Sequence, residues 1–223
     1  MKINEIGTVG VVGSGLMGSG IALNFALAGY QTIMSDLDDE ALTVAKARID
    51  AALAMFVDEG LTTTAEANKA VACVEVTTEL QDLARRSDFI TEAIVERLED
   101  KQKLFRYLDQ TCPSHTVIVS NTSSLKISDI GKGVGRQKKL GLTHYFVPPH
   151  IVPGVEIARG PGTDDATFQL LYDLMKSIRK VPIRVLKERS GYLINTINDA
   201  LAWEAGRLWA EGVASAEDIE LGI

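Results

Sequence analysis

The amino-acid sequence predicts an α/β protein in which a doubly wound, mostly parallel sheet with a helical excursion is followed by the beginning of an all-helical domain. Three observations lead to this prediction. Short apolar runs alternate along the chain with segments of helical periodicity, as is typical of a parallel sheet. A glycine-rich turn joins the first apolar run to the first helical segment. After residue 187 the alternation stops, and helical periodicity continues to the end of the chain.

The first apolar run and the turn after it have the spacing of a nucleotide-binding motif. Residues 9–12 (VGVV) predict a strand buried on both faces, and residues 13–18 read GSGLMG. In a G-x-G-x-x-G turn the first glycine permits a tight bend, the second lets the backbone approach a pyrophosphate, and the third lets the helix pack closely on the sheet. Free N–H groups at the start of that helix then face the phosphates. We therefore predict a Rossmann-type dinucleotide site that uses Gly13, Gly15, Leu16, Met17 and Gly18.

The next strand ends in an acidic residue. Apolar positions recur at helical spacing after the turn, Gly29 is placed to end that helix, and residues 31–36 (QTIMSD) predict the second strand. Asp36 would lie at the tip of this strand, where its carboxylate accepts hydrogen bonds from the adenosine ribose hydroxyls. A carboxylate there repels a 2′-phosphate, and residues 37–39 (LDD) supply no arginine or lysine. We therefore expect NAD, and not NADP, as the cofactor.

The rest of the sheet domain continues the alternation of helices and strands. Helical patterns cover 39–60, 64–72, 80–87, 98–111 and 164–178. Strand patterns cover 74–78, 89–94, 116–121, 140–146, 155–158 and 183–186. The first two of these helices follow one another without a strand between them, so we expect them to form the excursion from the sheet.

The pattern changes after Lys187. Residues 191–212 are helical in pattern at almost every position, and residues 215–223 form a further helical segment without a terminal cap. We expect residues 1–187 to form an NAD-binding domain. We expect residues 188–223 to begin a helical domain for dimerisation and substrate binding, which would make the chain truncated. The apolar stripe of the long helix consists of Leu193, Ile197, Leu201, Ala205 and Leu208.

Composition and charge narrow the classes of partner. The chain has 223 residues and a formal net charge of −7, and no cluster of basic residues exceeds three. We therefore expect a small-molecule substrate, and neither a nucleic acid nor an anionic membrane as the main partner. No apolar run approaches the ~20 residues that cross a bilayer. The sequence predicts no metal site.

The two cysteines bear on the compartment. Cys73 and Cys112 are far apart, and the chain enters its first strand without a secretory leader. This favours a cytoplasmic protein with reduced thiols. Either cysteine could be a nucleophile, but a buried structural thiol is the interpretation that we favour.

One histidine is placed for acid–base chemistry. His144 lies near the carboxyl end of a predicted strand (GLTHYF), where ligands collect in open α/β sheets. Glu156 follows twelve residues later, after a proline-rich loop that can return the chain alongside itself. A carboxylate behind an imidazole fixes its tautomer, so such a pair can take the proton of an alcohol as hydride leaves its carbon. The alternative is a satisfied strand histidine and an unrelated surface glutamate. We interpret His150 as a surface or substrate contact and His115 as structural.

Two further groups of polar residues are candidates. Asn121, Thr122, Ser123 and Ser124 follow a predicted strand, so one hydroxyl could bind a substrate oxygen, or the group could provide an N-cap for the next helix. Asn195 lies in the first turns of the long C-terminal helix, where an amide has below-average helix propensity. Asn195 either has a role in a ligand-binding cleft between the sheet and this helix or faces solvent.

Taken together, these motifs resemble the 3-hydroxyacyl-CoA dehydrogenase family over essentially the whole chain. The shared segments are VGVVGSGLMGSGIA with Asp36, EAIVERLEDKQKLF, SNTSSL, GLTHYF with VPGVEI, and ERSGYLIN followed by EGVASAEDI. The resemblance implies oxidation of a 3-hydroxy to a 3-keto group, with NAD accepting the hydride, and a homodimer built by the helical domain. It implies that His144 is the general base and Glu156 its orienting partner. It also implies that Ser123 and Asn195 contact the reacting oxygen or the base. Glu96 and Lys101 would lie beside the cofactor, and we expect Asn121 to bind the cofactor as well.

Some positions depart from the family's pattern. Val147 stands where the family usually has an asparagine, and Thr196 where it usually has an arginine. The run Pro148-Pro149-His150 resembles the branch that contains gulonate and carnitine dehydrogenases and lambda-crystallin. A free 3-hydroxy acid as substrate, or a non-catalytic NAD-binding role, is therefore an alternative. The 6-phosphogluconate-like 3-hydroxyacid dehydrogenases are a further alternative, but they use a lysine on the long helix. This chain has no lysine after Lys187, so we do not favour that family.

Overall fold

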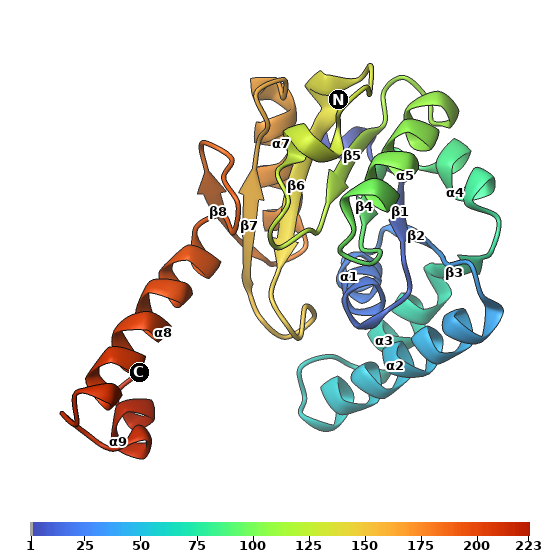
Figure 1. Cartoon of the computed structure of the whole chain (residues 1–223). Coiled ribbons are helices and arrows are strands. Elements are labelled where there is room, and N and C mark those ends of the chain that lie inside the picture. Colours follow the sequence, from blue (N-terminus) through green and yellow to red (C-terminus); the bar gives the residue numbers. More distant parts are fainter. Residues whose placement is uncertain (1) are drawn as a thin grey trace.

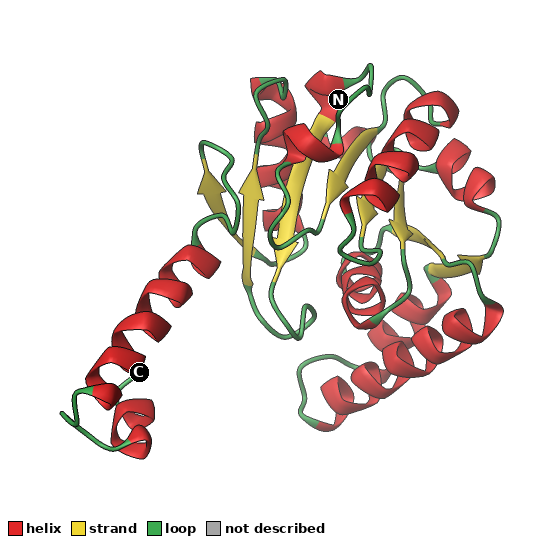
Figure 2. Cartoon of the chain, viewed as in Figure 1, coloured by secondary structure: helices red, strands yellow, loops and turns green. Residues whose placement is uncertain are grey.

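The computed structural model describes residues 2–223, and within them eight strands form one sheet (Figures 1 and 2). The order across the sheet is β3-β2-β1-β4-β5-β6-β7-β8, and every neighbouring pair is parallel except β6 and β7, which are antiparallel. The predicted mostly parallel, doubly wound sheet is confirmed. The strands are β1 (Thr8–Val12), β2 (Gln31–Ser35), β3 (Val74–Thr77), β4 (Phe89–Glu92), β5 (Val117–Ser120), β6 (Leu140–Tyr145), β7 (Gly154–Ala158) and β8 (Val181–Val185).

Helices cover both faces of the sheet, because each central strand is apolar on both sides. Every residue of β4, β5 and β6 is buried. One apolar cluster joins the sheet to α1, α2, α3 and α7, and a second joins it to α4, α5 and α6. The helices are α1 (Leu16–Leu27), α2 (Asp39–Asp58), α3 (Thr64–Ala72), α4 (Leu80–Arg86), α5 (Leu98–Thr111), α6 (Ile127–Ile130), α7 (Asp165–Ser177), α8 (Ile194–Ala210) and α9 (Ala216–Leu221).

Local sequence explains where several helices begin. Asp38 caps α2 by accepting a hydrogen bond from the N–H of Glu40, and Asp164 caps α7 in the same way. Thr63 and Glu66 form a reciprocal capping box at the start of α3. Helices α2 and α3 form the predicted excursion, which lies below the sheet in Figure 1.

The predicted elements match the structure closely, apart from shifts of up to three residues in their bounds and short helices that were not predicted, among them the 3-10 helices at Ile3–Glu5 and Gln137–Lys139. Strand β8 begins at Val181, two residues earlier than predicted, and includes Pro182. This is tolerated because β8 is the edge strand, where a missing N–H donor can face solvent. Helix α6 was not predicted, because a four-residue helix carries too little periodicity to detect.

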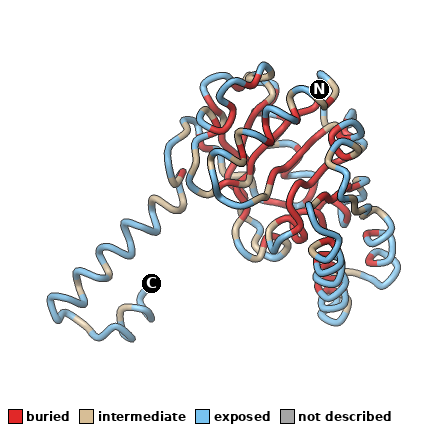
Figure 3. Tube along the Cα trace, turned by 45° about the vertical axis from the view of Figure 1, so that its right-hand side comes forward, coloured by how far each residue is buried: buried red, intermediate tan, exposed pale blue. Residues whose placement is uncertain are grey.

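Helix α8 leads away from the sheet domain, and its sides are exposed along its length (Figures 1 and 3). No residue of α8 or α9 is buried. The first three residues of the predicted apolar stripe are largely exposed: Leu193 is 40%, Ile197 53% and Leu201 45% exposed. Ala205 and Leu208, near the end of α8 that meets α9, are half-buried. None of the helices within residues 2–223 is both long and apolar enough to cross a membrane.

Candidate active site

The glycine-rich turn has room for side chains at only one of its three motif glycines. A Cβ atom on Gly13 would lie 2.6 Å from the carbonyl oxygen of Ala93, and one on Gly18 would lie 1.8 Å from the carbonyl oxygen of Gly13. Gly13 also has φ of +100°, which L-residues rarely adopt. A Cβ on Gly15, by contrast, would have no atom within 4 Å, so the space in front of it is open. The first and third glycines are thus needed for the turn itself, and the second faces open space.

Helix α1 begins at this open space. Its N-cap is Gly15, which makes no side-chain hydrogen bond, so the N–H groups of the first turn have no cap. Unpaired N–H groups and the positive end of the helix dipole attract an anion such as a pyrophosphate. The residues of the turn therefore fit a dinucleotide.

Asp36 follows β2 directly and contacts the same turn. Its Oδ2 accepts hydrogen bonds from the backbone N–H and the hydroxyl of Ser14, both at 2.7 Å, and its Oδ1 accepts one from the N–H of Leu37 at 2.8 Å. The carboxylate of Asp36 thus holds the glycine-rich turn in place. Sequence reasoning missed the contact with Ser14, since the two residues are brought together only by the pairing of β1 with β2.

His144 and Glu156 lie directly opposite each other in the antiparallel pair of β6 and β7. Nδ1 of His144 is 2.8 Å from Oε2 of Glu156. The glutamate is fully buried and the histidine 6% exposed, so Glu156 is not an unrelated surface residue. Because a carboxylate only accepts hydrogen bonds, the proton of a neutral imidazole sits on Nδ1, and Nε2 keeps its lone pair. This arrangement leaves Nε2 able to accept a proton.

The second oxygen of Glu156 binds the start of α8. Oε1 accepts hydrogen bonds from the backbone N–H groups of Leu193 and Ile194, at 2.9 and 2.8 Å. Burial alone would raise the pKa of Glu156, but the hydrogen bonds from His144 and from these two N–H groups outweigh it and hold the pKa below its usual value. The carboxylate is therefore ionised at neutral pH and links His144 to α8.

Glu96 holds the polar segment that follows β5. The hydroxyl of Thr122 and the backbone N–H groups of Ser123 and Ser124 all donate to Oε1 of Glu96. None of them caps α6, whose N-cap is Lys126 without a side-chain bond. The interpretation of these residues as an N-cap of α6 is therefore wrong. Their hydrogen bonds go to the carboxylate of Glu96 and, within the segment, from the N–H groups of Ser124 and Leu125 to the hydroxyl of Thr122.

Two asparagine side chains fix the position of this segment. Nδ2 of Asn195 donates to the carbonyl oxygen of Ser123 at 3.1 Å, so Asn195 is not simply solvent-facing. Oδ1 of Asn121 accepts from the N–H of Tyr145 at 2.9 Å, next to His144 in β6. The hydrogen bonds of Ser123 within residues 2–223 run through its backbone, which leaves its hydroxyl for a ligand.

Lys101 lies inside the protein, behind Glu96. It is 1% exposed, and its Nζ lies 2.5 Å from Oε1 of Glu92, 3.2 Å from Oε2 of Glu96 and 3.3 Å from the carbonyl oxygen of Ile94. Burial raises the pKa of Glu92, and the ammonium group opposes that shift. Burial also acts to raise the pKa of Glu96, but hydrogen bonds from Thr122 and the charge of Lys101 lower it overall. Sequence reasoning missed Glu92, although it belongs to the same EAIVE segment as Glu96.

Tyr192 is a further residue that sequence reasoning missed. It is fully buried at the start of α8, with φ of +47°, and its hydroxyl donates to the carbonyl oxygen of Leu125 at 2.5 Å. Its ring lies 6.4 Å from that of His144, which also packs edge-on against Phe146 at 4.9 Å. Two aromatic rings therefore restrict the imidazole.

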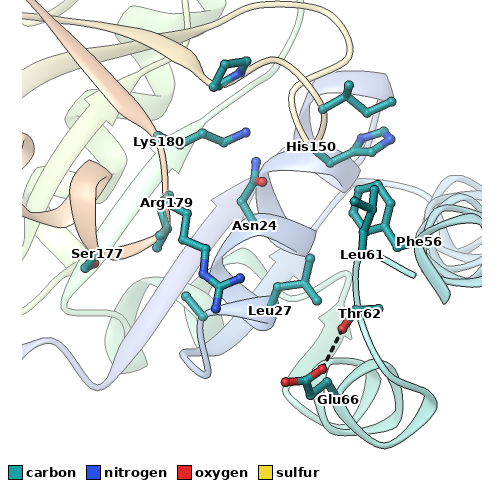
Figure 4. A pocket seen from close by; sticks show the side chains of 14 residues that line it. Asn24, Leu27, Phe56, Leu61, Thr62, Glu66, His150, Ser177, Arg179 and Lys180 are labelled. Atoms are coloured by element: carbon teal, nitrogen blue, oxygen red, sulfur yellow. Dashed lines mark hydrogen bonds between the residues drawn. The ribbon is translucent and has the colours of Figure 1, made fainter. Parts of the chain in front are cut away.

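His150 lies in the loop between β6 and β7 and lines a cavity of about 450 Å³ (Figure 4). Lys180 holds this loop, since its Nζ donates to the carbonyl oxygens of Pro149 and Val152 at 2.6 and 2.9 Å. Burial lowers the pKa of Lys180 to about 8. Arg179 has φ of +61° and extends from the α7–β8 turn into the cavity.

The remaining candidates lie apart from these groups. Nε2 of His115 is 2.9 Å from Oδ1 of Asp88, as suits a structural role in a turn. Cys73 and Cys112 are both unpaired, and burial raises the pKa of the Cys112 thiol to about 11, which makes it a poor nucleophile. Within residues 2–223, no three or more His, Cys, Asp or Glu side chains are grouped to hold a metal ion.

Comparison with known proteins identifies relatives of the whole chain. Residues 8–189 match the family model of the 3-hydroxyacyl-CoA dehydrogenase NAD-binding domain. The mitochondrial hydroxyacyl-coenzyme A dehydrogenase of Mus musculus is 34% identical over 220 residues, which cover 96% of this chain and 70% of the mouse protein. A lambda-crystallin homologue of Rattus norvegicus is 32% identical over 216 residues, covering 96% of this chain and 68% of that protein.

Solved structures agree with the sequence comparison. The crystal structure of (S)-3-hydroxybutyryl-CoA dehydrogenase from Ralstonia eutropha superposes with a TM-score of 0.91 at 32% sequence identity. The superposition covers 96% of this chain and 75% of the Ralstonia chain. The fold described above is therefore shared with an enzyme of known structure.

Proposed function

The chain belongs to the 3-hydroxyacyl-CoA dehydrogenase family, and we propose that it oxidises a 3-hydroxyacyl-CoA to the 3-ketoacyl-CoA with NAD. The observation that supports this most directly is the 2.8 Å contact between His144 and Glu156 in a sheet that also carries a glycine-rich dinucleotide turn. The pair supplies a base, and the turn supplies a site for the cofactor.

The cofactor residues follow from the turn and its neighbours. Uncapped N–H groups at the start of α1 would bind the pyrophosphate, and Asp36 would bind the adenosine ribose. The turn residues proposed to hold NAD are Gly13, Gly15, Leu16, Met17 and Gly18. We place Glu96, Lys101 and Asn121 beside the nicotinamide end, with Glu96 the most exposed of the three.

The proposed reaction separates a hydride from a proton. NAD, when bound, supplies the acceptor for the hydride that leaves the carbinol carbon. His144 accepts the hydroxyl proton at Nε2, and Glu156 stabilises the imidazolium that forms. Ser123 and Asn195 orient the reacting oxygen. In the reverse direction, protonated His144 returns the proton to the carbonyl oxygen.

We also propose the division of the chain and its assembly. Residues 1–187 would form the NAD-binding domain, and residues 188–223 would begin a helical domain that contributes to a homodimer. The exposed sides of α8 support this, because Trp203 and Trp209 are 81% and 63% exposed. We propose the cytoplasm as its location on the strength of two unpaired cysteines, although the mouse relative is mitochondrial by name.

Turnover of a substrate panel tests the proposed activity. NADH absorbance is followed with 3-hydroxybutyryl-CoA, gulonate and carnitine as substrates. We expect turnover of the acyl-CoA, and we expect His144→Gln to abolish it while the Kd for NAD stays near that of the unmutated protein. Unchanged turnover in His144→Gln would remove His144 from the mechanism.

A free 3-hydroxy acid is the second candidate substrate. The run Pro148-Pro149-His150, the exposed Val147 and the similarity to a lambda-crystallin homologue favour it. Faster turnover of gulonate or carnitine than of the acyl-CoA would establish this alternative. NAD binding without turnover of any of the three would favour a non-catalytic, crystallin-like role.

A further inference from the structure

We propose that Glu92 is a positioning residue, which sets the 122–124 segment through Lys101 and Glu96. The inference deepens the proposed dehydrogenase function and rests on it for the role of Ser123. Glu92 itself is fully buried at the carboxyl end of β4, so it has no access to a substrate. Any effect it has on a reaction must pass through its neighbours.

The hydrogen bonds of the Glu92 carboxylate reach two other elements besides the loop that follows β4. Oε1 accepts from Nζ of Lys101 in α5 at 2.5 Å and from the N–H of Ile94 at 2.8 Å. Oε2 accepts from the hydroxyl of Ser120 at the end of β5 at 2.6 Å. The side chain therefore ties together β4, β5 and α5 at the edge of the sheet where ligands bind in such folds.

Lys101 carries the connection outward. An ammonium group has three protons, and Glu92, Glu96 and the carbonyl oxygen of Ile94 provide three acceptors. No proton is left for a cofactor or substrate, so the role of Lys101 is to fix Glu96. The charge of a buried lysine needs a partner, and Glu92 is the one nearer to it.

Glu96 then sets the segment that follows β5. One of its oxygens faces Lys101, and the other accepts from Thr122, Ser123 and Ser124. Without Glu92, Lys101 would draw the Glu96 carboxylate inward, because among residues 2–223 these two are the carboxylates that pair with it. The backbone of Ser123 would then lose the acceptor that fixes it, and its hydroxyl would move relative to His144.

Glu92→Gln tests the proposal, because glutamine keeps the shape of the side chain and removes its charge. Glu99→Gln is the matched control, since Glu99 is exposed on the same helix as Lys101. We expect kcat to fall by about 10- to 100-fold in Glu92→Gln, as for other small displacements of a reacting group, with a much smaller change in KM. We expect no change in the control. An unchanged kcat in folded Glu92→Gln would overturn the inference.

A second readout does not depend on activity. Backbone amide resonances of Ser123 and Ser124 report on their bonds to Glu96, and we expect both to shift and to exchange faster with solvent in Glu92→Gln. If the chain turns over no substrate but these amides still respond, the coupling stands and the proposed function fails. If it turns over substrate and neither kcat nor the amides respond, the positioning role is refuted.

Two further variants cover the case in which Glu92→Gln does not fold. Ser120→Ala removes one hydrogen bond to Glu92 and also the bond that the Ser120 hydroxyl accepts from the N–H of Thr122 at 3.1 Å, so it should shift the Ser123 amide by both routes. Glu92→Gln combined with Lys101→Met removes both buried charges, so it should fold better than Glu92→Gln alone. Normal amide shifts for Ser123 in folded Ser120→Ala and in the double variant would also contradict the proposal.

Discussion

Nδ1 of His144 lies 2.8 Å from Oε2 of Glu156, and the other oxygen of this carboxylate accepts the backbone N–H groups at the start of α8. The orientation of the imidazole is therefore tied to the position of the long C-terminal helix. A change in the angle at which α8 leaves the sheet domain would pull on the carboxylate that fixes the histidine. This connection gives the helical segment a direct physical route to the proposed base.

Glu156→Gln should lower kcat by roughly 10²- to 10⁴-fold, since a glutamine amide can donate to Nδ1 and so move the proton to Nε2. His144 would then lack the lone pair that accepts the substrate proton. Steady-state kinetics with the acyl-CoA and NAD titration of the same sample measure the effect. The Kd for NAD should not change, because Glu156 lies in β7, away from the glycine turn. A variant with full kcat would show that Glu156 does not set the tautomer.

The same carboxylate should make stability depend on pH. The pKa of Glu156 is below its ordinary value of 4.5 in the folded protein, so its contribution to the free energy of unfolding is complete above that value. It is lost as the pH falls through the lower, folded-state pKa. Urea unfolding should therefore show a difference between the unmutated protein and Glu156→Gln that is constant near pH 7 and shrinks below about pH 4.5. A difference that stays the same down to pH 3 would contradict the low pKa.

Asp36→Ala should weaken NAD binding by about 10-fold or more, because it removes a charged acceptor for the ribose and for the Ser14 backbone. It should also narrow the preference for NAD over NADP, since the 2′-phosphate no longer meets a carboxylate. Fluorescence titration with both nucleotides gives the two Kd values. Asp39→Ala, which removes the same charge three residues later, is the control. Equal affinities for NAD and NADP in the unmutated protein would refute this reading of Asp36.

The fold and the pairing of His144 with Glu156 could be predicted from the sequence because both follow from local patterns. Alternating strands and helices predict the sheet, and the twelve-residue spacing of His144 and Glu156 fits one antiparallel return of the chain. The contacts of Glu156 with α8 depend instead on where β7 and α8 meet in space. Lys101 shows the same limit, since it lies in an amphipathic helix and its burial depends on how α5 packs against β4.

Arg179→Gly should raise the free energy of unfolding. Arg179 has φ of +61°, a conformation that costs an L-residue roughly 1–2 kcal/mol. Glycine removes this strain but loses about 0.5–1 kcal/mol more backbone entropy on folding, so the net gain should be roughly 0.5–1 kcal/mol. The guanidinium contributes a weak charge interaction that lowers the pKa of the exposed Glu66 across the cavity, so little is lost with the side chain. Urea unfolding near pH 7 measures the change.

The control for this substitution is Lys187→Gly, in an exposed loop where φ is not positive. It removes the same charge and adds the same flexibility to the unfolded chain, but it relieves no strain, so it should lower the free energy of unfolding. The two variants should therefore differ in sign. If Arg179→Gly destabilises the protein as much as the control does, the prediction is wrong. The contacts of the arginine side chain in the cavity of Figure 4 would then stabilise the fold by more than the strain of its positive φ destabilises it.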